Sequence, residues 1–442
     1  MRRASSRFIL PASLSAPLLV LAPAVAGHAD DAAAPAADPT GMTITVKNCN
    51  DSGLGSLRAA VASALSGDTI DMRGLGCRRI NLTSGAIMIA QDDLTLLGGG
   101  ITVDANGTSS VFRHSGIGWL RIRGMTIARG FHRPASWRQP QGGCLYSAGS
   151  IDLTYSTVHW CVLRGVSGGG VYASGAVTLT NSQVLGNTAS YYGGIATGGR
   201  LTAYRSRICG NHSLYSAVLA GGGLKAYGST FSANDAGALF AIGDTIIMNS
   251  TISGNRSRVE TLGVISGSGN HTTLISNSTV SDNRSGYRTL GLGTDTTIIN
   301  STIAFNQHAS EYPTTHCSEA TVPLDNLGIH TLHMESTIVA NNSCAGTPYL
   351  DVGKFPPSQA VLKGADNLIT LSNMPLPPDT ISTDPRLAPL ADNGGRTKTH
   401  ALLDDSPAID MGNNAAGLAY DQRGPGFPRV KGPQADIGAY ER

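Results

Sequence analysis

The chain has 442 residues, of which 41% are hydrophobic, 14% are charged and 5% are aromatic. The mean hydropathy of −0.02 excludes an intrinsically disordered chain, and a formal net charge of +2 gives no electrostatic basis for binding nucleic acid. The 55 glycines and the small number of charged residues favour a chain with many bends and few helices.

The first residues are typical of a secretory signal, which we assign to residues 1–29. Arg2, Arg3 and Arg7 supply the positive start, and the apolar stretch that follows ends near small residues suited to cleavage. A membrane span is the weaker interpretation, because prolines interrupt the apolar stretch and an Ala/Pro/Asp-rich linker follows at residues 30–42. We expect an exported protein whose mature chain has no transmembrane segment.

Residues 43–79 are predicted to form an N-terminal cap. A strand is expected at Thr43–Val46, and Ser56–Leu65 is the one convincing helix. Such a cap would cover the open end of a repetitive fold, where apolar surface and unpaired strand edges are exposed. The apolar face of the predicted helix consists of Leu57, Val61, Ala64 and Leu65.

Residues 80–347 carry an internal repeat, whose clearest copies begin at Asn249, Asn277 and Asn300. Each copy has a Ser in a small polar bend, a β-branched apolar residue two positions later, and an Asn five positions after the Ser. The Ser positions recur every 21 to 35 residues, a period typical of solenoids. Because the repeated segments contain strand formers, the sequence predicts a parallel β-helix with three short strands per coil.

One Asn per coil is expected to form a structural ladder. Neighbouring coils would stack about 4.8 Å apart, so each amide could donate to the carbonyl of the next coil. Asn also tolerates the left-handed backbone of a tight bend. A polar row that binds sugar is the alternative interpretation. The predicted ladder consists of Asn187, Asn211, Asn234, Asn255, Asn283, Asn306 and Asn341.

All seven cysteines lie after the predicted signal, in a compartment that permits disulfides. The sequence cannot fix their connectivity. A zinc site is not expected, because there is no Cys-x-x-Cys motif and no cluster of His. The candidate pairs are Cys49–Cys77, Cys144–Cys161 and Cys317–Cys344, which leave Cys209 free.

An aromatic and basic loop at 131–141 is the first candidate ligand-binding site. Trp can stack on the face of a sugar, and Arg can pair with a carboxylate. The alternative is a loop that folds its Trp onto the coil wall. The candidate residues are Phe131, His132, Arg133, Trp137 and Arg138.

The residues that follow the ladder Asn form a second candidate, because they would stack as a polar strip. The strip consists of Thr188, His212, Asp235, Arg256, Arg284 and Gln307. Asp235, Arg256 and Arg284 are the candidate ligand-binding residues within it. A solvated column of turn residues is the favoured interpretation of this strip.

Residues 348–442 are expected to form a distinct, irregular C-terminal module. Its acidic and amide side chains could hold a Ca²⁺ ion, although side chains that fix glycine-containing turns are the favoured interpretation. No other cofactor and no other metal is expected. The side chains in question are Asp392, Asn393, Asp410, Asp421 and Asp436.

Two stretches resemble known bacterial protein families. Residues 383–441 contain Asp-Pro-Arg, Asp-Asn-Gly-Gly, Ser-Pro-Ala-Ile-Asp-x-Gly, Asp-Gln-Arg-Gly and Asp-Ile-Gly-Ala-Tyr-Glu, in that order, and resemble the choice-of-anchor Q domain of exported bacterial proteins. Residues 50–70 resemble the capping start of bacterial right-handed parallel β-helix proteins. The resemblance implies a pectin-lyase-like fold and a location outside the bacterial cell or at its surface.

No position of the repeat carries carboxylates in successive coils, and the histidines show no triad spacing. We therefore expect a non-catalytic, monomeric protein that contacts polysaccharide or a cell-surface component along its flank. A polysaccharide lyase or a glycoside hydrolase of the same fold is the alternative.

Overall fold

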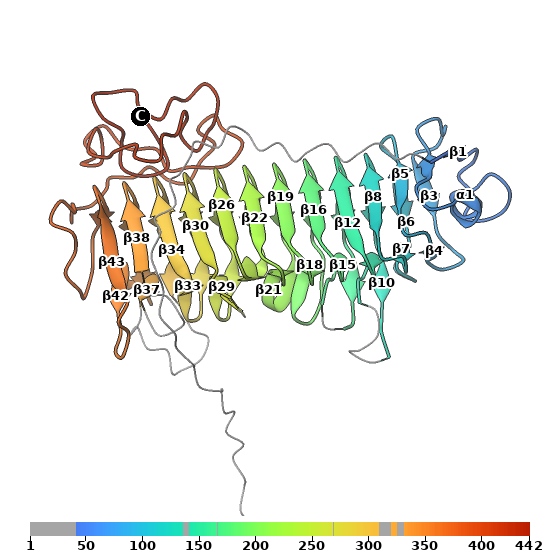
Figure 1. Ribbon diagram of the computed structural model, residues 1–442, viewed down its shortest axis with the longest axis horizontal. Coiled ribbons are helices and arrows are strands. Elements are labelled where there is room, and N and C mark those ends of the chain that lie inside the picture. Colours follow the sequence, from blue (N-terminus) through green and yellow to red (C-terminus); the bar gives the residue numbers. More distant parts are fainter. Residues whose placement is uncertain (1–40, 136–140, 166, 268, 309–319, 325–330) are drawn as a thin grey trace, which may run out of the picture. The chain divides into compact units, whose positions relative to one another are not determined.

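The computed structural model describes residues 41–135, 141–165, 167–267, 269–308, 320–324 and 331–442. The predicted signal and nearly all of the predicted linker lie outside these ranges. The described residues form a mostly-β parallel solenoid of about 12 turns with one short helix (Figure 1). No helix within these ranges is long and apolar enough to cross a bilayer.

Three parallel sheets of 13, 12 and 10 strands run along the solenoid, and a typical coil contributes one strand to each of them. Sheet A contains β1 (Thr43–Thr45), β2 (Thr69–Asp71), β5 (Leu94–Leu97), β8 (Trp119–Arg123), β12 (Ser150–Thr154), β16 (Val177–Thr180), β19 (Leu201–Tyr204), β22 (Leu224–Tyr227), β26 (Thr245–Met248), β30 (Thr272–Ser276), β34 (Asp295–Ile299), β38 (Thr331–Glu335) and β43 (Val361–Ala365). Sheet B contains β3 (Arg79–Asn81), β6 (Thr102–Asp104), β9 (Thr126–Ala128), β13 (Thr157–His159), β17 (Gln183–Leu185), β20 (Arg207–Cys209), β23 (Thr230–Ser232), β27 (Thr251–Ser253), β31 (Thr279–Ser281), β35 (Thr302–Ala304), β39 (Ile338–Ala340) and β44 (Leu368–Ile369).

Sheet C contains β4 (Ile87–Ile89), β7 (Phe112–His114), β11 (Leu145–Ser147), β15 (Val171–Ala173), β18 (Tyr192–Thr197), β21 (His212–Ala220), β24 (Asp235–Gly237), β25 (Leu239–Ile242), β29 (Glu260–Ile265) and β33 (Arg288–Gly293). The remaining strands form small sheets, which contain β10 (Phe131–His132), β14 (Val162–Leu163), β28 (Arg256–Ser257), β32 (Arg284–Ser285), β36 (Gln307–His308), β37 (Val322–Leu324), β40 (Ser343–Cys344), β41 (Thr347–Pro348) and β42 (Val352–Lys354).

Alternation of apolar and polar residues places one aliphatic core inside the coils. In β12, for example, Ile151 and Leu153 are fully buried, whereas Asp152 and Thr154 between and after them point outward. The same register repeats in β8 and β16, so aliphatic side chains stack on their counterparts from coil to coil. Stacking buries each coil against its two neighbours, so the solenoid builds a continuous core from contacts between adjacent coils alone.

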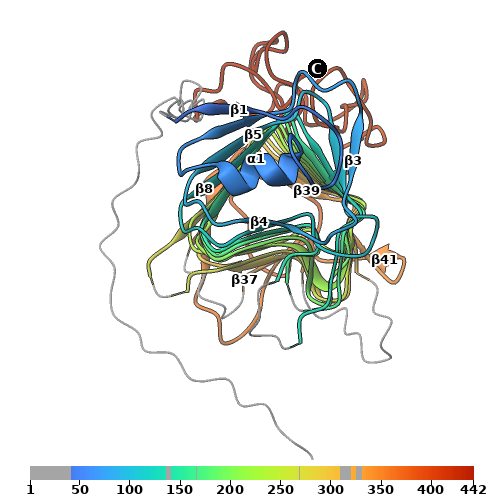
Figure 2. The ribbon, with the colours of Figure 1, turned by 90° about the vertical axis from the view of Figure 1, so that its right-hand side faces the viewer.

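The helix α1 (Leu57–Ser63) lies across the N-terminal end of the solenoid (Figure 2). The Ser56 hydroxyl accepts a hydrogen bond from the Ala59 amide and so caps the helix. Leu57, Ala60 and Val61 are buried against the first coils. The prediction that Leu65 belongs to the apolar face is wrong: the helix ends at Ser63, and Leu65 is 74% exposed.

Seven asparagines form a continuous ladder inside the bend between sheet B and sheet C. From one coil to the next, the Nδ2 of each Asn donates to the Oδ1 of the following Asn at 2.7–3.0 Å. The same Oδ1 also accepts the backbone N–H of the Asn in the preceding coil. The ladder consists of Asn187, Asn211, Asn234, Asn255, Asn283, Asn306 and Asn342.

The last rung is Asn342, so the prediction of Asn341 was wrong by one residue. Asn341 instead has φ of 57°, as does Phe305 directly before the rung Asn306. The left-handed residue is therefore the one that precedes each rung, whereas the rung itself keeps its side chain inside. In the other bend, between sheet A and sheet B, the left-handed positions include Asn249, Asn277 and Asn300.

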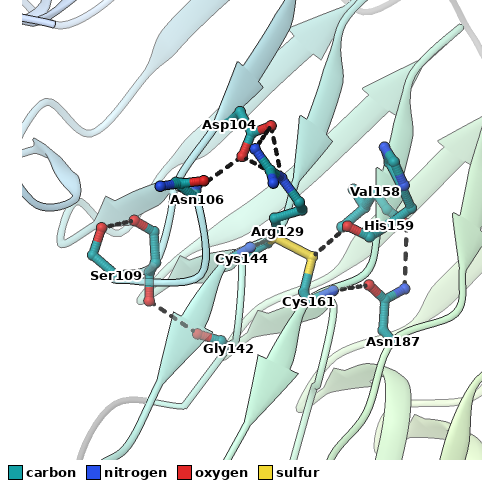
Figure 3. The surroundings of a disulfide bond; sticks show 12 residues. Asp104, Asn106, Ser109, Arg129, Gly142, Cys144, Val158, His159, Cys161 and Asn187 are labelled. Carbon is teal, nitrogen blue, oxygen red and sulfur yellow. Dashed lines mark hydrogen bonds and ion pairs between the residues drawn. A yellow bond between two sulfur atoms is a disulfide. The ribbon is translucent and has the colours of Figure 1, made fainter. Parts of the chain in front are cut away.

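The ladder is closed at both ends. At its start the Cys161 amide donates to Asn187 Oδ1, and Cys161 forms a disulfide with Cys144 beside the first rung (Figure 3). At its end Asn342 Nδ2 donates to the buried carboxylate of Asp351 at 2.7 Å. A second disulfide joins Cys49 to Cys77, and Cys209 is a free thiol. The third predicted pair involves Cys317, which lies outside the described residues.

The last coil reaches into the predicted C-terminal module, because β43 still pairs with β38 and β44 with β39. Residues 383–442, which we call the C-terminal segment, contain no regular strand or helix. This segment packs on the outer face of sheet B. Thr251 donates to the Lys398 carbonyl, Thr279 donates to Gln422, and the Ala439 amide donates to Thr302.

Removal of one rung is expected to destabilise the fold strongly. Asn255→Ala would leave the amide groups of Asn234 without their acceptor and would remove one of the two donors to Asn283 Oδ1, at a cost of at least about 3 kcal/mol. Asn181→Gly is the matched control, because Asn181 occupies a left-handed bend with φ of 48°, which Gly adopts freely. Chemical denaturation measures both variants; equal losses of stability would contradict the role of the ladder.

Two buried titratable groups lie near the end of the ladder. Burial raises the pKa of Asp351 to about 6, against the hydrogen bonds from Asn342, Thr370 and Leu371 that favour its ionised form. Burial lowers the pKa of His308 to about 4, and its Nδ1–H donates to the Tyr287 carbonyl. The stability that Asp351 contributes is present at low pH and is lost as the pH rises from about 4 to about 6. The stability that neutral His308 contributes is present above about 6.5 and is lost as the pH falls to about 4.

The two contributions therefore oppose each other between pH 4 and 6.5, each on the order of 3 kcal/mol. In Asp351→Asn, unfolding free energy should fall more steeply on acidification than in the unmodified protein. In His308→Gln it should fall less steeply or rise. Denaturation midpoints measured between pH 4 and 6.5 test both expectations. Parallel pH profiles for the two variants would contradict the opposite pH dependences assigned to Asp351 and His308.

Candidate functional site

The structure joins the two predicted ligand-binding stretches into one column at the bend that follows the ladder. Phe131 in β10 pairs with Val162, Val162 pairs with Thr188, and Thr188 pairs with His212. His212 pairs with Asp235, and further along Arg256 pairs with Arg284, which pairs with Gln307. We call these outward residues, from Phe131 to Gln307, the corner column. Trp137 and Arg138 lie outside the described residues.

The corner column changes character along its length. At its start Phe131 and His132 are half-buried, and Arg133 beyond them is exposed. In its middle His212 Nδ1 lies 2.7 Å from Asp235 Oδ2, and both side chains are exposed. Arg256 and Arg284 then follow in adjacent coils, with both side chains exposed. Two guanidinium groups one coil apart make this end attractive to anions.

A row of tyrosines on the outer face of sheet C is a feature that the sequence reasoning missed. Arg113, Tyr146 and Tyr172 pair in successive strands of that sheet. The rings of Tyr146 and Tyr172 are stacked, with centroids 5.9 Å apart and planes within 8°. The Arg113 guanidinium lies 4.8 Å from the Tyr146 ring centroid. We call Arg113, Tyr146 and Tyr172 the tyrosine row.

A second pair of stacked tyrosines lies in the segments that lead into sheet C. Tyr191 and Tyr215 have ring centroids 5.0 Å apart, and both are exposed. Tyr191 directly precedes β18, and Tyr215 lies in β21. These two strands follow the tyrosine row along sheet C. Rings that stack from coil to coil place their edges and hydroxyl groups in a row, which is suited to a long ligand that lies along the solenoid axis.

Sheet A carries a different chemistry on its outer face. Asp152 is in register with Arg121, and Arg121 forms an ion pair with Asp93 at 3.0 Å. Burial raises the pKa of Asp152, whereas the Thr154 hydroxyl, Arg123 and Arg121 act in the opposite direction. A carboxyl group with a raised pKa can hold a proton at a pH at which an ordinary aspartate has lost it.

The acidic side chains of the C-terminal segment are bound within the chain. Asp421 forms an ion pair with Arg423, and Asp436 accepts hydrogen bonds from the amides of Asp410 and Arg442. Asp392 accepts from the Gly394 amide, and Asn393 donates to the Thr399 carbonyl. Within the described ranges no group of three or more His, Cys, Asp or Glu side chains could hold a metal ion.

A Ser–His contact also lies at the junction of the solenoid and the C-terminal segment. The Ser281 hydroxyl lies 2.6 Å from His400 Nε2, and His400 Nδ1–H donates to the Ala388 carbonyl. Both side chains are buried, and burial lowers the pKa of His400. A buried hydroxyl cannot reach a substrate, so this contact fastens the segment to β31.

The fold is shared with a polysaccharide-cleaving enzyme. The structure matches the crystal structure of the pectate lyase Pel9A with a TM-score of 0.51 and 13% sequence identity, over 90% of this chain and 97% of the lyase. At this identity the match establishes a pectin-lyase-like β-helix fold and nothing about activity. No protein-family model and no curated protein matches the chain, so the resemblance to the choice-of-anchor Q domain gains no support.

Proposed function

We propose that this protein is a monomeric, exported bacterial β-helix protein that binds polysaccharide along the outer face of sheet C without cleaving it. The observation that carries the proposal is the tyrosine row, in which Tyr146 and Tyr172 present parallel rings one coil apart. Rings stacked on a rigid scaffold turn their faces to one another and present their edges and hydroxyl groups outward, which gives successive sugars apolar contact and hydrogen bonds at little entropic cost.

Binding is favoured over cleavage by the side chains that share this face. Arg113 lies over Tyr146, and Leu219 and Phe240 continue the outward row in β21 and β25. These three are guanidinium, aliphatic and aromatic groups, which hold a ligand but do not transfer protons at neutral pH. A carboxylate, that of Glu260, lies on this face only further along the same register, over Gly263 and Gly291. The corner column would add polar contacts through Asp235, Arg256 and Arg284.

Export is supported by the two disulfides Cys49–Cys77 and Cys144–Cys161, since disulfides persist in oxidising compartments. The pectin-lyase-like fold agrees with a place outside the cytoplasm, where polysaccharides are found.

A polysaccharide lyase or glycoside hydrolase is the second candidate. It is favoured by the fold match to a pectate lyase and by Asp152, whose raised pKa suits a proton donor. Arg121 and Arg123 beside it could neutralise an acidic sugar.

A panel of uronate and neutral polysaccharides, tested with and without Ca²⁺, separates the two candidates. Calorimetry should detect binding of at least one polymer, and Tyr146→Ala with Tyr172→Ala should weaken that binding at least tenfold, equivalent to about 1.4 kcal/mol. Tyr155→Ala is the matched control, because Tyr155 is 69% exposed at the bend between sheet A and sheet B, away from the tyrosine row.

The same incubations are assayed for unsaturated sugar ends and for reducing ends. If the unmodified protein forms either product and Asp152→Asn does not, the enzymatic function replaces the proposal of binding without cleavage. Binding that the two tyrosine variants leave unchanged would refute the assignment to sheet C.

A further inference from the structure

The outer face of sheet B has two halves, of which the C-terminal segment covers one. The C-terminal segment covers the strands from β27 to β39, and Figure 1 shows it only over that end of the solenoid. The strands from β3 to β23 carry the same face without that cover. We call these strands the open half.

The covered half shows how polypeptide docks on this face. In β27, β31 and β35 the outward first residue is a threonine that hydrogen-bonds the segment, whereas in β39 it is the apolar Ile338. Thr251 donates to the Lys398 carbonyl at 2.6 Å, and Thr302 accepts the Ala439 amide at 3.1 Å. Thr279 donates to the Gln422 side chain at 2.6 Å. A column of hydroxyls, one per coil, therefore satisfies polar groups from three separate stretches of the segment.

The two bends that border the covered half add further contacts. At the bend before sheet B, Asn277 and Asn300 donate their side-chain amides to the carbonyls of Tyr420 and Asn413. At the bend after sheet B, the left-handed residue Phe305 packs against the His400 ring, with centroids 5.0 Å apart. Docking thus uses three columns: threonine, asparagine and aromatic.

The open half repeats the first-position column in part and has one counterpart of each of the other two kinds of contact, Asn181 and Trp160. Its first-position column is in register with Thr251 and consists of Arg79, Thr102, Thr126, Thr157, Gln183, Arg207 and Thr230. Asn181 occupies the left-handed position that Asn277 and Asn300 occupy in the covered half. Trp160 occupies the position of Phe305, with φ of 54° against 57°.

Trp160 is placed as an anchor for a partner. Its side chain is 63% exposed, although Trp is usually among the more buried residues. The indole lies edge-on to His159 at 4.4 Å, and its Cδ1 is 3.1 Å from where a Cβ of Gly186 would be. Held between these neighbours, the ring would lose little freedom on binding, as in interface hot spots.

The charge of the open half is positive. Within the described residues, Asp104 is the one acidic residue among the outward positions of the sheet B strands from β3 to β23, and its side chain is 1% exposed. Arg79 and Arg129 from the neighbouring coils both pair with it, at 2.6 and 2.8 Å, which leaves one positive charge in excess (Figure 3 shows the Arg129 contact). Arg207 adds a second exposed positive charge.

We propose that the open half is a docking surface for an acidic polypeptide segment of another protein. The threonines of the first-position column and Asn181 bind its backbone, Trp160 packs on an apolar side chain, and Arg79, Arg129 and Arg207 contact its carboxylates. A polypeptide is favoured over a polysaccharide because the same columns already bind backbone carbonyls in the covered half. This surface is separate from the tyrosine row on sheet C.

The test uses poly-L-glutamate as the acidic polypeptide, with polygalacturonate and dextran sulfate as anionic polymers that lack a peptide backbone. The chain has three tryptophans, so Trp119→Phe with Trp137→Phe makes fluorescence report on Trp160 alone. Poly-L-glutamate should shift the Trp160 emission, and added salt should weaken the binding.

Calorimetry then compares variants. Trp160→Gly, which suits the left-handed bend, should weaken poly-L-glutamate binding at least tenfold, and Thr126→Val with Thr157→Val at least fivefold. Lys363→Gln in β43 on the outer face of sheet A is the control and should leave the affinity unchanged, because this exposed side chain lies on another sheet. An unchanged Trp160 emission overturns the proposal. So does equally tight binding of polygalacturonate or dextran sulfate that the threonine variants do not affect, which would mark the face as a surface for anionic polysaccharide.

Discussion

The hydrogen bonds that pass from one asparagine to the next constrain every other part of this molecule. Each rung from Asn187 to Asn342 is a buried amide, and a buried amide without partners costs several kcal/mol. A rung can be satisfied only if the coils above and below place an amide at the same point. The spacing between rungs nevertheless varies from 21 to 36 residues. Differences in coil length must therefore be absorbed elsewhere, chiefly in the segments between the ladder and sheet C.

This division separates structure from function within each coil. Inward positions hold aliphatic side chains or rungs, and they have little freedom to vary. Outward positions do not affect the stacking, and each face has acquired its own chemistry: hydroxyls and arginines on sheet B, aromatic rings on sheet C, and a charged cluster around Asp152 on sheet A. The C-terminal segment uses one of these faces, which shows that an outward column can recognise another stretch of chain.

The repeat in the sequence was sufficient to predict the solenoid, because the Asn and Ser that mark most bends accept backbone amides from the neighbouring coil. It failed at Asn341, because Thr337 and not Ser336 occupies the Ser position of that coil: the Ser301 amide donates to Thr337 Oγ1, and Asn342 lies five residues after Thr337. The predicted end of the helix was also wrong: Leu65 fits the helical period, but the helix ends at Ser63. Local pattern predicts which elements exist better than where they end.

The candidate site was harder to predict than the fold. The corner column could be read from the residues after each Asn, but its connection to Phe131 depends on the two-residue pairing of β10 with β14. The tyrosine row was missed because Tyr146 and Tyr172 are 26 residues apart in strands of unlike sequence, and only the register makes them neighbours. Trp160 and Phe305 likewise gain their common role from equivalent bends and not from any shared motif.

Amide hydrogen exchange of the full chain, resolved by residue, tests the ladder most directly. The backbone amides of Asn211, Asn234 and Asn255 lie in bends, outside the strands, and donate only to side-chain oxygens of the next coil. If those oxygens hold the coils together, these amides should exchange as slowly as the amides in the middle of β16 and β19, through global unfolding. Exchange at the rate of exposed loop amides would show that the asparagines are not linked, and the account of the fold given above would be wrong.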